Sequence, residues 1–344
     1  MKPAELLFLS QEDVIRAGGL DMSLAVPTME EVFLLHHRKD YVLPSKCVLR
    51  WGDRDTETTR GRINAMPGWI GGGFQAVGIK WIASSPMNPF KHKLPRASAV
   101  IVLNDPDTLV PVAVMDGTVI SAARTGANTG VAARYLARRD SRTLGLIGAG
   151  VQNRTQLLAL MYALPAINEV RVYDVSRERA ERFVLEMQPQ TAAALGVVGS
   201  AREAVAGADV FVTATVTHEP IVRPDWVEPG VFYSHVGSHE CTFEAILKMD
   251  KRVVDDWDEI KHRGVETLAI MYNSGVIGDD AIYGELGEIV AGRKPGRERA
   301  NERIYFNTVG MGIEDVALAW KIYQRASDMG LGKRLRLWES PFAV

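Results

Sequence analysis

Three cationic residues in the N-terminal half of the chain have apolar neighbours. They are Lys46 in LPSKCVL, Lys80 in GIKWIAS and Arg124 in SAARTGA. A buried ammonium such as that of Lys80 is costly unless an anion pairs with it or its pKa falls. Two interpretations stay open: a structural ion pair, or a basic pocket for a substrate carboxylate in which Lys80 donates or accepts a proton.

A second stretch, LGLIGAGVQN at residues 144–153, has the pattern of a phosphate-binding turn. The apolar run predicts a buried strand, Gly148 permits a tight turn, and Gly150 lets the backbone approach a pyrophosphate. A helix beginning near Val151 would direct its positive N-terminal end at the phosphates. Asn153 replaces the third glycine of the usual fingerprint, which mainly serves helix–strand packing. The order of strand, turn and helix predicts a dinucleotide site.

The next predicted strand, EVRVYDV, supports this interpretation because it ends in an acid, Asp174. A carboxylate at that place accepts hydrogen bonds from the ribose hydroxyls and repels a 2′-phosphate. The sequence therefore favours NAD over NADP, although Arg177 weakens that preference.

Further cofactor contacts are expected where later strands end, because ligands of open α/β sheets bind along the carboxyl edge. DVFVTAT and HVG supply such ends, although the threonines could equally be ordinary loop hydroxyls. The expected cofactor-binding residues are Arg124, Thr125, Gly148, Gly150, Val151, Gln152, Asp174, Ser176, Arg177, Thr213, Ala214, Thr215, Val236, Gly237 and Gly310.

Composition narrows the classes of partner. The 344 residues are 47% hydrophobic and 24% charged, with a net charge of −2 and no basic run. We therefore expect no nucleic-acid and no membrane partner. Two cysteines are too few for a disulfide framework, and no histidine spacing indicates a metal site. With no signal-like segment at the start, the expected location is cytoplasmic.

The elements that must position these residues fall into two regions. Residues 47–116 read as short strands between turn residues, which predicts a mostly antiparallel α+β domain. From about residue 121, strands alternate with helices, which predicts a Rossmann-type doubly wound parallel sheet. The expected fold class is α/β, with a substrate-binding and dimerisation domain at 1–122 and 320–344. An NAD-binding domain is expected at 123–319, and the tail is expected to be a loop feeding one long helix that returns to the N-terminal sheet.

The motifs together resemble the ornithine cyclodeaminase/mu-crystallin family. The resemblance rests on GIKW, SAARTGANTG, LGLIGAGVQ, YDVSRERA, DVFVTAT and GMGIEDVA, and it covers nearly the whole chain. Within the family, RINAMPGWIGG, KWIASSPMN and LPRASAVIVLND look closest to the branch that oxidatively cleaves N-(2-amino-2-carboxyethyl)-glutamate.

The resemblance implies a role for each basic residue and an assembly. Lys46 matches a residue that holds the substrate carboxylate, and Lys80 matches the active-site lysine. Arg124 matches an arginine that grips the carboxylate beside the nicotinamide, and Arg62 is a further candidate anion contact. Family members are dimers, so a homodimer is expected.

One segment departs from the family pattern. Ornithine cyclodeaminases carry an aspartate after a Gly-Gly pair at a strand end, whereas this chain reads VGSHECTFEAI. His239 or Glu240 occupies that neighbourhood, and either is a candidate catalytic acid/base. The alternative for His239 is a loop histidine without chemistry.

The resemblance and the residues together favour an NAD(H)-dependent oxidoreductase. It would act on the C–N bond of an amino acid or N-substituted amino acid through an imine. A second interpretation is an ornithine cyclodeaminase-type lyase that releases ammonia and recycles NAD+. A third is a nicotinamide-dependent binding protein of the mu-crystallin type.

Overall fold

The computed structural model describes residues 3–52, 61–217 and 219–343. The chain divides into two compact units, and each is described by itself. The first unit comprises Met1–Arg124 and Met311–Val344, and the second comprises Thr125–Gly310. The chain passes from the first unit to the second within one helix, α3 (Thr118–Leu136). It returns just before another helix, α11 (Gly312–Asp328).

The first unit contains an eight-stranded, mostly antiparallel sheet. Its strands lie in the order β16-β1-β7-β6-β5-β4-β2, and β3 also pairs with β4. They span Ala4–Leu9 (β1), Tyr41–Val42 (β2), Cys47–Trp51 (β3), Gly61–Ile70 (β4), Ala76–Ser84 (β5), Ala97–Asn104 (β6), Pro111–Asp116 (β7) and Lys333–Trp338 (β16).

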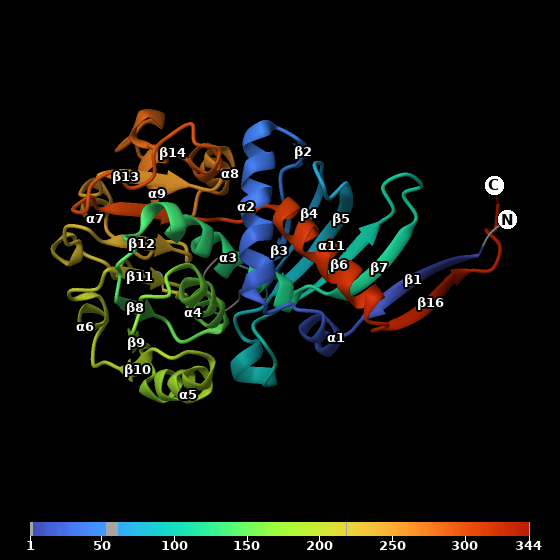
Figure 1. The fold of residues 1–344 in the computed structure, drawn as a ribbon, viewed down its shortest axis with the longest axis horizontal. Coiled ribbons are helices and arrows are strands. Elements are labelled where there is room, and N and C mark those ends of the chain that lie inside the picture. Colours follow the sequence, from blue (N-terminus) through green and yellow to red (C-terminus); the bar gives the residue numbers. More distant parts are fainter. Residues whose placement is uncertain (1–2, 53–60, 218, 344) are drawn as a thin grey trace. The chain divides into compact units, whose positions relative to one another are not determined.

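The alternation of strand residues decides which side chains this sheet buries. Ala76, Gly78 and Lys80 of β5 are buried, while Trp81, the next residue, is exposed. Helix α11 packs on β4, β5 and β6 and contacts the long helix α2 (Met22–Arg38), as Figure 1 shows. The short helix α1 (Gln11–Arg16) begins at a capping box in which Ser10 accepts from the Asp13 amide. The inner face of the sheet is therefore the face that carries Lys80.

The second unit contains an eight-stranded sheet whose strand pairs are all parallel. The strands lie in the order β10-β9-β8-β11-β12-β15-β13-β14. They span Thr143–Ile147 (β8), Glu169–Tyr173 (β9), Ala194–Val197 (β10), Val210–Thr213 (β11), Phe232–His235 (β12), Lys251–Val254 (β13), Gly284–Glu285 (β14) and Ile304–Asn307 (β15). After β8 the chain adds β9 and β10 on one side of that strand. It then crosses back and adds β11 on the other side of β8. Ligands bind at such a reversal of strand order.

Helices connect these parallel strands. They are α4 (Val151–Ala163), α5 (Arg177–Met187), α6 (Ala201–Val205), α7 (Phe243–Leu247), α8 (Trp257–Arg263), α9 (Thr267–Asn273) and α10 (Leu286–Val290). A π-helical turn, Asn88–His92, belongs to the first unit. Short 3-10 turns of the second unit cover Gln188–Gln190, Pro224–Trp226 and Asp279–Ala281. The core of this unit includes Phe211, Tyr233 and Tyr305, which extend from the adjacent strands β11, β12 and β15.

The expected fold class is confirmed, and so is the long C-terminal helix that packs on the N-terminal sheet. Five strands were not expected: β1 and β16, which pair with each other, the two-residue strands β2 and β14, and β15, which lies in the interior of the parallel sheet. RINAM and GWI also join into one strand, β4, across Pro67. This proline is tolerated because β3 pairs with β4 up to Ala65 and β2 pairs from Trp69, which leaves Pro67 outside both ladders.

Candidate active site

Lys80 is the centre of a buried ionic cluster in the first unit. Its side chain is 1% exposed, and its Nζ donates to Oδ2 of Asp315 at 2.5 Å and to Oγ of Ser121 at 3.2 Å. Burial lowers the pKa of Lys80 to about 8, against the opposing attraction of Asp315. Nearby positive charges on Arg124 and Lys46 lower it further. A lysine in this condition exchanges a proton near neutral pH, as a general acid or base must.

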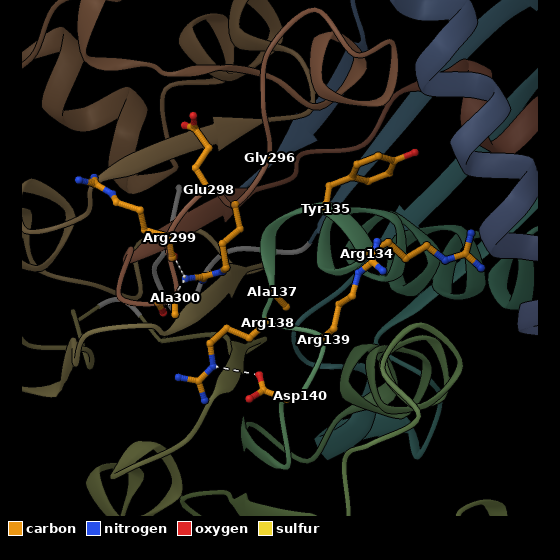
Figure 2. A pocket seen from close by; sticks show the side chains of 11 residues that line it. Arg134, Tyr135, Ala137, Arg138, Arg139, Asp140, Gly296, Glu298, Arg299 and Ala300 are labelled. Atoms are coloured by element: carbon orange, nitrogen blue, oxygen red, sulfur yellow. Dashed lines mark hydrogen bonds and ion pairs between the residues drawn. The ribbon is translucent and has the colours of Figure 1, made fainter.

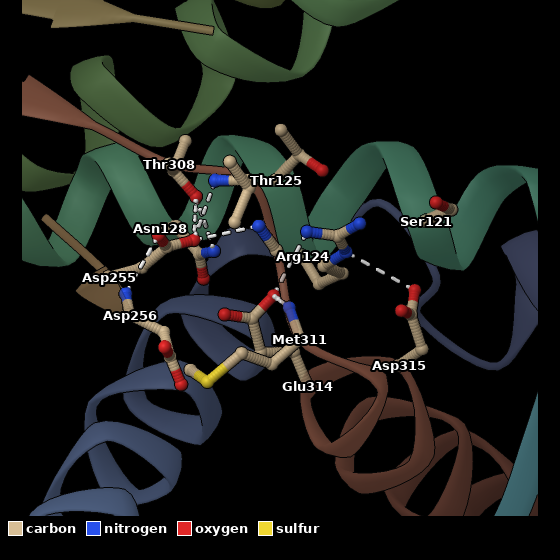
Figure 3. Close-up of polar contacts among 12 residues, drawn as sticks. Ser121, Arg124, Thr125, Asn128, Asp255, Asp256, Thr308, Met311, Glu314 and Asp315 are labelled. Atoms are coloured by element: carbon tan, nitrogen blue, oxygen red, sulfur yellow. Dashed lines mark hydrogen bonds and ion pairs between the residues drawn. The ribbon is translucent and has the colours of Figure 1, made fainter. Parts of the chain in front are cut away.

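Arg124 completes the cluster from helix α3. Its Nη1 donates to Oε2 of Glu314 at 2.9 Å, and its Nε donates to Oδ1 of Asp315 at 3.2 Å (Figure 3). Asp315 therefore lies between the two cations, with one carboxylate oxygen toward each. Two bases and two acids balance, so the cluster carries no net charge when all four are ionised.

Helix α11 delivers the two acids because its first turn approaches β4 closely. A Cβ on Gly312 would lie 2.9 Å from the carbonyl oxygens of Met66 and Pro67. Only glycine permits that approach. Met66 pairs directly with Lys80 across the β4–β5 ladder, so the close contact brings Asp315 to the lysine.

Lys46 and Arg62 lie in the same sheet region. Lys46 directly precedes β3, is half-buried, and is close enough for its charge to lower the pKa of Lys80. Arg62 and Met66 both belong to β4 and lie four positions apart, so their side chains are on the same face of the sheet. Met66 pairs with Lys80, so this is the face that carries Lys80.

The glycine turn of the second unit follows β8 directly. Gly148 has a φ of +97°, and a Cβ there would lie 2.7 Å from the carbonyl oxygen of Ala214. Gly150 is the N-cap of α4, and no atom lies within 4 Å of the place where its Cβ would be. Nδ2 of Asn153 donates to the carbonyl oxygens of Ile147 and Gly148, at 2.9 and 2.5 Å. The asparagine side chain thus stabilises the turn through these two hydrogen bonds. The space beside Gly150 stays open.

Asp174 follows β9, beside the glycine turn. Its Oδ2 accepts from the Ala149 amide at 2.8 Å, and its Oδ1 accepts from the Ser176 amide at 2.9 Å. Ser176 caps helix α5, and exposed Arg177 pairs with Glu181 at 2.8 Å. Asp174 therefore supports the turn that precedes α4, and each of its oxygens has a second lone pair.

Five of the expected cofactor residues lie at the end of β11 or in the loops after β11 and β12. Thr213 is buried, and its hydroxyl contacts that of Tyr233 at 2.8 Å. Ala214, Thr215, Val236 and Gly237 are only partly buried and follow the two strand ends.

Other expected cofactor residues lie along the same edge or near it. The Gly310 amide donates to Asp255 at 2.7 Å, and the Thr308 hydroxyl also donates to Asp255 (Figure 3). The Thr125 carbonyl accepts from Gln156. Val151 is exposed, and Gln152 is half-buried.

The two acid/base candidates of this unit differ in access. His239 is half-buried, and its Nδ1 lies 3.1 Å from the Thr267 hydroxyl. Burial lowers the pKa of His239, against an opposing effect of Glu219. Glu240 is fully buried and accepts hydrogen bonds from Thr215 and Gly237. His239 can meet a small molecule, whereas Glu240 faces the protein interior.

Comparison with known proteins identifies the family. Residues 22–330 match the ornithine cyclodeaminase/mu-crystallin family. This chain belongs to that family. The resemblance inferred from the sequence motifs is confirmed.

Three relatives match almost the whole chain. N-((2S)-2-amino-2-carboxyethyl)-L-glutamate dehydrogenase of Staphylococcus aureus is 38% identical, over 97% of this chain and 99% of that protein. The structure of Thermococcus litoralis Delta(1)-pyrroline-2-carboxylate reductase in complex with NADH and L-proline has 36% identity and a TM-score of 0.87. It covers 95% of this chain and 99% of that one. An archaeal alanine dehydrogenase dimer with bound NAD has 35% identity and a TM-score of 0.87, over 97% and 100%.

Sequence reasoning missed the acidic half of the Lys80 cluster. Asp315 and Glu314 are both fully buried, and Ser121 is nearly so. The motif GMGIEDVA was noted, but its acids had no assigned role. The available signal was a pair of acids directly before the apolar run VALAW, since such acids need cationic partners when buried.

A separate pocket lies at the opposite, amino-terminal edge of the parallel sheet. Its volume is about 590 Å³. Arg138, which lines it, donates to Asp209 just before β11 and lies 3.5 Å from Asp140 (Figure 2). Arg297 is fixed there by backbone carbonyls that include that of Leu136. This pocket contains none of the expected site residues. Arg138 and Arg297 bind neighbouring parts of the chain there, Asp209 and the Leu136 carbonyl respectively.

Within residues 3–52, 61–217 and 219–343, no group of three or more His, Cys, Asp or Glu side chains is arranged to hold a metal ion. None of the helices in those ranges combines the length and apolar character that crossing a membrane requires.

Proposed function

We propose that this protein is an NAD(H)-dependent oxidoreductase that acts on the C–N bond of an amino acid or N-substituted amino acid through an imine. The main observation in support is that Lys80 is fully buried against Asp315 and has a pKa of about 8. Such a pKa suits proton exchange with an amine. Family membership supports it, since the three relatives above are dehydrogenases and a reductase of amino-acid-type compounds.

The residues of the second unit fit a dinucleotide. The turn at Gly148 ends a parallel strand at the reversal of strand order, and the space beside Gly150 is open. Amides at the start of α4 would hold the pyrophosphate, and the remaining lone pairs of Asp174 would accept from the ribose hydroxyls. When bound, the nicotinamide accepts or donates the hydride.

The basic residues of the first unit would bind and deprotonate the substrate. Lys46 is proposed to bind the substrate carboxylate, with Arg62 as a further contact from the same sheet region. Arg124 is held in place by Glu314 and Asp315 and is proposed to bind the same carboxylate.

Proton transfer is assigned to Lys80. In the oxidative direction, the neutral Lys80 amine takes a proton from the substrate ammonium. The neutral amine could then give up a hydride from Cα to the bound nicotinamide, which would leave a protonated imine that water hydrolyses. In the reductive direction, the Lys80 ammonium returns the proton to the nitrogen.

His239 is proposed as a second acid/base group, acting on water or on the leaving amine. Its lowered pKa keeps the ring neutral at pH 7, so that it can accept a proton. Replacing His239 with glutamine should slow hydrolysis of the imine more than hydride transfer, so NADH would form in a burst followed by a slower phase.

A homodimer is part of the proposal. The outer face of the first sheet carries a continuous apolar row: Pro67, Ile79, Val102, Val114 and Phe8 pair in succession across β4, β5, β6, β7 and β1. Trp81 and Val100, a neighbouring cross-strand pair, are 47% and 42% exposed. An apolar face of this extent indicates a protein partner. A second copy is proposed because the archaeal alanine dehydrogenase is a dimer.

The experiment that tests the proposed activity is a substrate screen. Purified protein is incubated with NAD+ and a panel of amino acids and their N-substituted conjugates, and with NADH and 2-oxo acids plus amines. We expect net formation or consumption of NADH with at least one compound class. A lyase would release ammonia with no net NADH. A binding protein would bind the nucleotide and turn over no member of the panel.

A further inference from the structure

Glu240 is a carboxylate with no exposed surface, and the loops that follow two strands of the parallel sheet bind to it. Its Oε1 accepts from the Thr215 amide and from the Thr215 hydroxyl, both at 2.6 Å. Its Oε2 accepts from the Gly237 amide at 2.8 Å. Thr215 follows β11 and Gly237 follows β12, so one side chain joins the ends of neighbouring strands.

The charge of Glu240 is held by these donors. Among the described residues, no lysine or arginine forms an ion pair with it, and the nearest basic group is Nε2 of His235 at 3.3 Å. Burial lowers the pKa of His235 to about 3, so this ring is neutral. Burial raises the pKa of Glu240, and the opposing bonds from Thr215 and Gly237 only partly offset this effect. The carboxyl group therefore depends on the loops for its hydrogen bonds, as the loops depend on it.

Two glycines extend the same set of contacts. A Cβ on Gly237 would collide with the carboxyl group of Glu240, so this position requires glycine for as long as Glu240 keeps its place. A Cβ on Gly148 would lie 2.7 Å from the carbonyl oxygen of Ala214 and 3.3 Å from Cγ2 of Thr215. The glycine turn after β8 thus packs on the loop that Glu240 fixes. Three successive loops of the carboxyl edge are connected through one side chain.

We propose that Glu240 is a positioning residue that fixes these three loops in the conformation that binds the dinucleotide, and that it exchanges no proton with the substrate. The inference rests on the proposed function, because it requires the nucleotide to bind at this edge. It separates the two candidates for the acid/base role: both oxygens of Glu240 accept hydrogen bonds from the loops, whereas His239 is half-buried and contacts the Thr267 hydroxyl.

The test uses the full-length protein with Glu240 replaced by glutamine. Glutamine retains one acceptor oxygen but turns an NH2 group toward the Thr215 or the Gly237 amide. Loss of such an acceptor weakens binding by about tenfold where the loops must be ordered. We expect the Kd for NADH to rise by about that factor. Amide hydrogen exchange at Thr215 and Gly237 should accelerate in the absence of nucleotide. The shape of the pH–kcat profile should be retained.

A matched control is Glu302→Gln. Glu302 is also buried and accepts from the amides of Glu298 and Arg299, but it precedes β15 at the amino edge of the same sheet. Its replacement should leave the NADH Kd within about twofold of wild type, since that edge takes no part in nucleotide binding. A second variant, Gly237→Ala, keeps the Glu240 carboxylate but displaces it. This variant should reproduce the faster exchange and the weaker NADH binding.

Several results would overturn the proposal. One is a Glu240→Gln protein with wild-type NADH affinity and unchanged exchange at both amides. Another is loss of one limb of the pH–kcat profile at unchanged NADH affinity, which would make Glu240 a proton-transfer group. If Glu240→Gln does not fold, Gly237→Ala decides by exchange at the Thr215 amide, because Gly237 is itself an expected cofactor contact: wild-type exchange at Thr215 would overturn the proposal. If the wild-type protein itself does not bind NADH, the proposed function fails. The exchange data then still show whether Glu240 fixes the loops.

Discussion

Replacing Asp315 with asparagine removes the anionic partner of Lys80 and nearly preserves its shape. Asp315 raises the pKa of Lys80, so its loss should lower that pKa below the value of about 8. A hydrogen bond to a charged group contributes about 1.5–3 kcal/mol, and one pKa unit corresponds to about 1.4 kcal/mol. The pKa of Lys80 should therefore fall by about one to two units.

The assay is the pH dependence of kcat/KM in the oxidative direction. Neutral Lys80 accepts the substrate proton, so the rate should rise as pH increases through the pKa of Lys80, near 8 in the wild type. In Asp315→Asn this limb should lie about one to two units lower. In the reductive direction the Lys80 ammonium is required, so the rate should fall as pH increases through the same value.

The control is Glu314→Gln on the same turn of α11. Glu314 is equally buried, but its carboxylate binds Arg124 and makes no hydrogen bond to Lys80. Its removal should leave the limb near the wild-type position. An Asp315→Asn limb that stays in place or moves upward would refute the reasoning that Lys80 is the titrating group. Thermal unfolding of both variants shows whether the comparison is made on folded protein.

The remaining predictions concern other parts of the molecule. Lys80→Ala should abolish turnover while NADH affinity, measured by fluorescence titration, stays within about twofold of wild type, because Lys80 is not among the expected cofactor contacts. Asp174→Ala should weaken NAD binding about tenfold more than NADP binding. Equal losses would limit Asp174 to supporting the Ala149 amide. Trp81→Glu should convert a dimer to a monomer in light scattering, and a wild-type monomer would contradict the proposed interface.

Features with local causes could be predicted from the sequence. The spacing of Ser10 and Asp13 predicts the capping box that begins α1. The glycine at 148 predicts a turn that needs positive φ, and the structure places it at +97°. The alternation of strands and helices after residue 121 predicts the parallel sheet. Each of these depends on residues close together in the chain.

Features that depend on distant pairing could not be predicted. Lys80 clearly needed an anion, but its partner Asp315 lies 235 residues away, and no local pattern selects it. Strands β1 and β16 come from opposite ends of the chain, so neither has a neighbour in sequence that indicates its pairing. Strand β15 follows β14 in the chain, yet it lies between β12 and β13, so its place in the sheet depends on pairing with distant segments.

The role of Asn153 could be predicted from the sequence only in part. Sequence reasoning held that losing the third glycine would alter packing more than phosphate chemistry. The structure adds what the asparagine does: its side-chain amide donates to two carbonyl oxygens of the turn. That contact depends on the geometry of the turn, which the sequence alone does not supply.

The most direct test of the account is the fate of the hydrogen on the substrate Cα. A substrate found in the screen is prepared with deuterium at that carbon and incubated with NAD+, and the reduced nucleotide is analysed by mass spectrometry. The account predicts one deuterium in each NADH formed, and no such product from Lys80→Ala. Unlabelled NADH, or deuterium that returns to a cyclised product without net NADH, would contradict it.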